Sequence, residues 1–163
     1  MSDTSAAEPV SERVFLVVVD DTPELHVAIR YACRRAKRVG GRVALLNVME
    51  SPEPQSWAAI GDLLREETRQ KAEARLAQVG DEVASLLGRP PILHLREGGR
   101  REQLLKLLAE DATISVLVLA AGAGSEGPGP LISSLASKHT GGLRCALTIV
   151  PGGLSDAEID AIS

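Results

Sequence analysis

Short apolar runs alternate with longer amphipathic segments along this chain, and the runs predict β-strands. The clearest run, Val14–Val19, is apolar at every position and stops at an Asp-Asp-Thr-Pro sequence. Such a continuous run is typical of a central parallel strand that is covered on both faces. Similar runs predict four further strands, at 43–48, 92–96, 116–119 and 145–150.

The segments between these runs predict helices, because their apolar residues recur every three or four positions. We expect helices over 24–39, 57–87, 101–109 and 131–139. The second helix carries its apolar stripe at Leu64, Ala72, Leu76, Val79, Val83 and Leu86. Glycine pairs at 40–41 and 141–142 are typical helix stops.

The order βαβαβαβαβ predicts an α/β fold, a single doubly wound five-stranded parallel sheet with helices on both faces. We assign residues 13–151 to this domain, residues 1–12 to a disordered N-terminal arm and residues 152–163 to a C-terminal tail. In such sheets ligands bind beyond the carboxyl ends of the strands, where the strand order reverses. The candidate ligand loops are therefore 20–23, 48–54, 97–100 and 120–130.

Composition narrows the choice of partners. The net charge of −4 and the presence of one Trp, one Tyr and one Phe argue against nucleic acid, which needs cations and stacking surfaces. No run is long enough to span a membrane, and residues 1–12 do not resemble a signal peptide, so we expect a cytoplasmic protein. Cys33 and Cys145 lack metal-ligand spacing and are interpreted as buried thiols.

Candidate catalytic and metal-binding motifs are weak. Asp20 and Asp21 follow the first strand and could hold a metal, as in a response-regulator receiver, but the other residues of that site are missing. The alternative is that Asp21 or Thr22 caps the first helix. The three histidines lie on separate predicted elements, so we interpret them as surface or core residues rather than catalytic bases.

A Gly/Pro-rich loop follows the strand at 116–119 and precedes a helix, an arrangement that can bind phosphate. Gly122, Gly124 and Gly127 match the dinucleotide fingerprint in spacing. However, the strand is a late one, prolines at 128 and 130 delay the helix, and no acidic residue follows about twenty positions on. We therefore do not expect a dinucleotide site.

Several segments, in their order and spacing, resemble the universal stress protein family. They are Phe15–Asp20, Lys37–Gly40, Ala44–Val48, Glu97-Gly98, Val116–Leu119, Ser134–Lys138 and Ala146–Val150. The resemblance runs from about Val14 to Pro151. It implies a doubly wound five-stranded sheet and a homodimer, often formed through the last strands.

The family's ATP-binding members carry Gly, two residues, Gly, nine residues, then Gly-Ser or Gly-Thr. That signature falls here on Ala120, Ala123, Ser133 and Ser134, so its three glycines are replaced. If glycine serves there for positive φ or close phosphate approach, each replacement costs about 1–2 kcal/mol. Three replacements would weaken ATP binding by about two to four orders of magnitude.

Other residues keep a nucleotide site open as an alternative. The resemblance places Asp20 where the family's first-strand acid touches the nucleoside, and Val48 close to the adenine pocket. The offset glycines, Gly122 and Gly124 among them, could form an anion nest of their own. Restoring glycine at 120, 123 and 133 is expected to recover at least weak ATP affinity.

The resemblance favours the branch similar to universal stress protein A, which does not bind ATP. It implies a non-enzymatic stress-response homodimer that binds an unidentified protein partner and needs no cofactor. The alternative is an adenine-nucleotide sensor or very slow ATPase that holds ATP or AMP on the loop at 120–134, and a hydrolase of another kind is a third hypothesis. An unpaired edge invites another chain, so we expect the dimer to form through Leu147, Thr148, Ile149 and Val150.

Overall fold

The computed structural model describes residues 12–50 and 58–163 of the 163-residue chain. Most of the arm predicted over residues 1–12, and residues 51–54 of one predicted ligand loop, lie outside the described residues. The strands are β1 (Val14–Val19), β2 (Arg42–Met49), β3 (Ile92–Glu97), β4 (Ile114–Ala121) and β5 (Ala146–Pro151). The helices are α1 (Leu25–Val39), α2 (Ala58–Leu87), α3 (Arg100–Glu110), α4 (Pro130–Ser134) and α5 (Asp156–Ile162).

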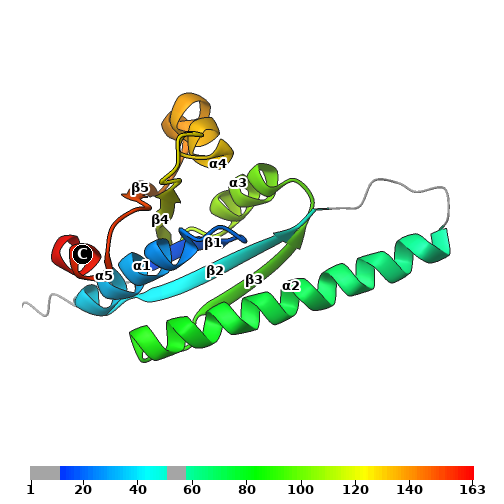
Figure 1. Ribbon diagram of the computed structural model, residues 1–163, viewed down its shortest axis with the longest axis horizontal. Helices are drawn as coiled ribbons and strands as arrows, with labels where there is room; N and C mark the ends of the chain where they lie inside the picture. The colour runs from blue at the N-terminus through cyan, green and yellow to red at the C-terminus, as the bar shows by residue number, and fades with distance from the viewer. Residues whose placement is uncertain (1–11, 51–57) are drawn as a thin grey trace, which may run out of the picture.

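All five strands form one parallel sheet in the order β3-β2-β1-β4-β5 (Figure 1). In the register of the central strands, Leu16 lies between Ala44 of β2 and Leu117 of β4. Each predicted strand is present, with bounds shifted by two residues or fewer at each end. The predicted α/β class and five-stranded parallel sheet are therefore confirmed.

Helices cover both faces of the sheet, and the alternation along β1 divides the core into two layers. Phe15, Val17 and Val19 pack with apolar residues of α1, α2 and α5. Leu16 and Val18 pack on the opposite face with residues of α3 and α4. Every residue of β1 is buried, as the continuous apolar run predicts.

The long helix α2 packs its apolar side chains on the sheet through its C-terminal half, whereas its N-terminal half makes polar contacts with the strand ends. Its buried side chains are Leu76, Val79, Val83 and Leu87. Its N-terminal turns run beyond the ends of β2 and β3 (Figure 1). Leu64, which the sequence pattern placed on the buried stripe, is 40% exposed and lies before the buried part of the helix, which begins at Leu76.

The predicted fourth helix is divided into three short pieces. α4 ends at Ser134 and continues as a π-helical turn, Leu135–His139, followed by a 3-10 turn, Thr140–Gly142. Ile132 and Leu135 are its buried anchors. The segment therefore packs on the sheet over a single turn rather than along a regular helix.

Residues beyond β5 form an element that the sequence pattern did not predict. The Ser155 hydroxyl accepts a hydrogen bond from the Glu158 N–H at 3.2 Å and caps α5. Ile159 is fully buried against the α1 face of the sheet. Arg30 of α1 donates to both carboxylate oxygens of Asp160, at 2.8 and 2.7 Å. Residues 152–163 are thus packed onto the domain.

Candidate functional site

The strand order reverses between β1 and β4, so the chain leaves these neighbouring strands toward opposite faces of the sheet. After β1 it enters α1, and after β4 it enters the glycine loop at 122–129 and then α4. A crevice opens at such a point in doubly wound folds. The candidate site lies there, at the carboxyl ends of β1, β2 and β4.

Asp20, the first residue after β1, is part of a turn. Its carboxylate accepts hydrogen bonds from the Thr22 N–H at 2.9 Å and from the Thr22 hydroxyl at 2.7 Å. The predicted cap at Asp21 or Thr22 is wrong, because the N-cap residue of α1 is Glu24, which makes no side-chain capping bond. Asp20 and Asp21 do not form a metal site with a third ligand within the described residues.

The glycine loop closes on itself. The Gly122 N–H donates to the Pro128 carbonyl at 3.1 Å, and a Cβ on Gly122 would lie 2.9 Å from the Gly127 carbonyl oxygen. Gly127 and Gly129 have φ values of +89° and +111°, which favour glycine. Gly122, Gly127 and Gly129 therefore serve the loop's own turns, whereas a Cβ on Gly124 would meet open space.

The replaced glycines of the ATP signature are not strained here. Among the described residues, no residue other than glycine has a positive φ, so Ala120, Ala123 and Ser133 all adopt ordinary backbone conformations. The strain argument, that a bound triphosphate would require positive φ at these positions, is not tested by this conformation and stays a prediction. The crowding argument, that a Cβ prevents close approach of phosphate, stays a prediction.

Two backbone donors of this loop are already engaged within the protein. The Gly122 N–H is bonded within the loop, and the Ala123 N–H donates to Glu24 Oε1 at 3.3 Å. Pro128 and Pro130 have no N–H to offer. The loop therefore lacks several of the donors that hold a chain of phosphates in a glycine-rich cradle.

A cavity of about 160 Å³ lies at the switch point. Asp20, Ala120 and Gly122 line it, as do Glu24 and Arg100, over an apolar floor that includes Val18, Leu25 and Ala28. The structure thus brings together part of the predicted site. Ala123, Gly124, Ser133 and Ser134 are not among its lining residues, and the Ser134 hydroxyl instead accepts a hydrogen bond from Arg101 at 3.2 Å.

A second cavity, of about 300 Å³, lies beside the carboxyl ends of β1 and β2. Asp20 and Val48 line it together. Three cations, Lys71, Arg75 and Arg100, also line it, and of these only Arg100 lies in a candidate ligand loop of the sequence. Arg75 donates to the Asp20 backbone carbonyl at 3.4 Å.

One signal in the sequence could have identified Arg100. It stands at the first position of α3, where the helix dipole disfavours a cation. Its side chain lines both cavities, so it links the Asp20–Val48 region to the glycine loop.

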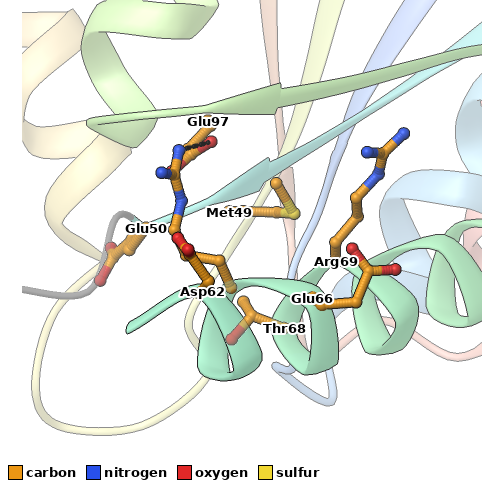
Figure 2. A pocket seen from close by; sticks show the side chains of 8 residues that line it. Met49, Glu50, Asp62, Glu66, Thr68, Arg69 and Glu97 are labelled. Atoms are coloured by element: carbon orange, nitrogen blue, oxygen red, sulfur yellow. Dashed lines mark hydrogen bonds and ion pairs between the residues drawn. The ribbon is translucent and has the colours of Figure 1, made fainter. Parts of the chain in front are cut away.

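A third pocket, of about 240 Å³, adjoins the second cavity and lies under the exposed turns of α2. Figure 2 shows side chains of α2 facing Met49, Glu50 and Glu97 across this space. Arg65 donates to both oxygens of Glu97, at 3.0 and 3.1 Å. Because the lining is charged and largely exposed, we interpret the Arg65–Glu97 ion pair as a surface contact that contributes little to stability.

Among the described residues that line these three cavities there is no cysteine and no histidine. Burial raises the pKa of Cys33 to about 12, and it also raises the pKa of Cys145. Burial lowers the pKa of His94, whose Nε2 has no hydrogen-bond partner within the described residues. His26 Nδ1 lies 2.6 Å from the Pro23 carbonyl oxygen. We therefore interpret these two cysteines and two histidines as structural residues.

Comparison with known proteins decides the family. The sequence model of the universal stress protein family matches residues 12–151. The chain belongs to the universal stress protein family. No curated protein sequence matches it significantly.

Solved structures of this family share the fold. Universal stress protein UspA from Lactobacillus plantarum superposes with a TM-score of 0.70 at 16% identity, covering 88% of this chain and 99% of that one. A universal stress protein in complex with cAMP gives 0.63 at 18%, covering 88% and 99%. One from Archaeoglobus fulgidus in complex with dAMP gives 0.61 at 14%, covering 86% and 98%.

The family match extends over the sheet and both cavities, and it ends where the C-terminal segment begins. Over the residues that the structure describes, no helix is long and apolar enough to cross a lipid bilayer.

Proposed function

We propose that this universal stress protein acts without enzymatic activity, as a homodimer that binds a protein partner in the cytoplasm, and that it does not hold ATP tightly. The observation that carries the proposal is the state of the glycine loop. The Gly122 N–H is bonded within the loop and the Ala123 N–H donates to Glu24. The prolines at 128 and 130 have no N–H, which removes two further donors. A triphosphate needs such donors to offset its loss of hydration.

Titration calorimetry tests the nucleotide part of the proposal. With about 0.1 mM protein and ATP, no heat of binding is expected, because a site weakened toward millimolar affinity stays nearly empty under these conditions. A dissociation constant in the micromolar range would overturn the proposal.

A second candidate function, an adenine-nucleotide sensor, is favoured by a separate observation. Asp20 and Val48 share the cavity beside β1 and β2 with Lys71, Arg75 and Arg100, which supply positive charge for a single phosphate. Solved relatives are described as complexes with cAMP and dAMP. Titration with AMP and cAMP separates the candidates, because a monophosphate could bind there without the glycine loop.

The dimer is proposed to form through the exposed edge of β5. This strand pairs with β4 on one side and is the last in the sheet order. Ile149 is 41% exposed and Thr148 is half-buried, whereas Val150 is buried in its own chain and can contribute only through its backbone. Two such edges could pair antiparallel about a two-fold axis.

Light scattering after gel filtration tests this assembly. Ile149→Lys is expected to give monomers, because it places a charge at the centre of the paired edges. Leu93→Lys is a matched control, since Leu93 is 48% exposed on β3 at the opposite edge of the sheet. A monomeric unmodified protein at micromolar concentration would refute the dimer.

A further inference from the structure

The side chain of Glu24 lies between α1 and the glycine loop. Glu24 begins α1, and its backbone carbonyl accepts the Val27 N–H at 3.0 Å. Its Oε1 accepts the Ala123 N–H at 3.3 Å, and Glu24 also lines the cavity at the switch point. A carboxylate of the protein itself therefore takes a backbone donor that a bound anion would otherwise use.

The segment that follows β5 packs against this contact. The Gly152 N–H donates to the Ala121 carbonyl at 3.0 Å. A Cβ on Gly152 would overlap both that carbonyl oxygen and the Cγ of Glu24, so the backbone here lies directly on the Glu24 side chain. A Cβ on Gly153 would lie 3.7 Å from the Cβ of Ala123. The segment thus confines both partners of the Glu24–Ala123 hydrogen bond.

The other end of the segment is fastened to α1. Asp160 receives two hydrogen bonds from Arg30, and its Oδ1 lies 3.1 Å from Arg34 Nε. Arg34 also donates to the Ser163 hydroxyl at 3.2 Å, and Ile159 is fully buried. Bidentate arginine–carboxylate pairs fix orientation as well as distance. Since Glu24 begins the same helix, docking of α5 and placement of Glu24 are mechanically connected.

We propose that Glu24 is the residue that excludes phosphate from the glycine loop, and that residues 152–163 form a clamp that holds it in place. With the clamp in place, the negative charge of Glu24 repels anionic ligands from the cavity at the switch point, and its carboxylate occupies the Ala123 N–H. Release of the clamp frees Glu24 to turn toward solvent and leaves the N–H available. The inference rests on the proposed weak ATP binding and gives its cause.

Substitution of Glu24 tests the first half of the inference. Glu24→Gln keeps the size and removes the charge, and Glu24→Ala also removes the hydrogen-bond acceptor. Because Glu24 makes no side-chain capping bond, both variants should retain α1. With ATP as the probe in calorimetry, we expect affinity to rise at least tenfold in Glu24→Gln and further in Glu24→Ala.

Substitutions at the clamp test the second half. Arg30→Ala and Asp160→Asn break the same ion pair but change the local charge in opposite directions. Both should raise ATP affinity by about fivefold or more if the clamp acts through Glu24, the lower end of typical site-to-site coupling. A pure charge effect would instead move the two variants in opposite directions. Lys37→Ala is the control, since Lys37 lies exposed on α1 outside the clamp.

Amide hydrogen exchange supplies a readout besides ATP binding. Residues 152–163 should exchange faster in both clamp variants, whereas the sheet should keep its protection. Folded Glu24 variants with unchanged ATP affinity would overturn the inference, and would do so clearly if the Ala120→Gly, Ala123→Gly, Ser133→Gly variant alone gained affinity. Tight ATP binding by the unmodified protein would instead overturn the proposed function.

Discussion

Truncation of Ile159 measures how strongly the C-terminal helix α5 is held to the domain. The side chain is fully buried and belongs to the same apolar cluster as Phe15 and Val27. Ile159→Ala removes three carbon atoms from this cluster. At about 0.8 kcal/mol for each buried methylene, the lost transfer free energy is about 2.4 kcal/mol. The cavity that remains raises the total to about 3–4 kcal/mol.

Thermal unfolding followed by circular dichroism measures this loss. For a chain of this size, each kcal/mol lowers Tm by about 2–4 °C, so Ile159→Ala should melt roughly 6–16 °C lower. Ile162→Ala is the matched control, because Ile162 is on the same helix and is 56% exposed. Its expected change is within about 0.5 kcal/mol. Equal melting temperatures for the two variants would refute the packing of α5.

Three further predictions concern titration and thiol chemistry. Arg30 holds the pKa of Asp160 below its ordinary value of 3.8, so the stability that this ion pair contributes is complete above pH 3.8 and is lost at more acid pH. Amide hydrogen exchange of residues 152–163 should therefore become faster as the pH falls below that value. Burial lowers the pKa of His94 below 6.5, so the stability contributed by the neutral imidazole is complete above pH 6.5 and falls as the pH drops. A proton NMR titration that gave an ordinary pKa for His94 would contradict this prediction. Since the pKa of Cys33 is about 12, an alkylating reagent at pH 8 should label this thiol only after the protein unfolds. Mass spectrometry measures the labelling, and rapid labelling of the native protein would contradict the prediction.

The fold could be predicted because its strands carry a local signal. Val14–Val19 is apolar throughout, and burial on both faces of a parallel sheet produces this pattern directly. Leu64 shows where the pattern fails, since a helical stripe identifies a helix but does not say how far the sheet beneath it extends. α5 was missed because a seven-residue helix with one buried anchor, Ile159, has almost no periodicity to detect.

The candidate site was predicted only in part, for a related reason. Asp20, Val48 and Ala120 follow or end strands, so topology alone brings them to one edge of the sheet. Glu24 and Arg100 reach the same edge from helix starts, and of the two only Arg100 falls in a loop that the sequence named, at 97–100. Glu24 meets a loop residue 99 positions away, which no spacing rule foresees.

The most direct test of the proposed weak ATP binding is whether the purified protein carries a nucleotide. Denaturing the protein and measuring the released small molecules by mass spectrometry gives this answer without added ligand. We expect no ATP above a trace amount, because the Gly122 N–H is bonded within the loop and Glu24 takes the Ala123 N–H. ATP released at about one molecule per chain would contradict the proposed weak binding of ATP.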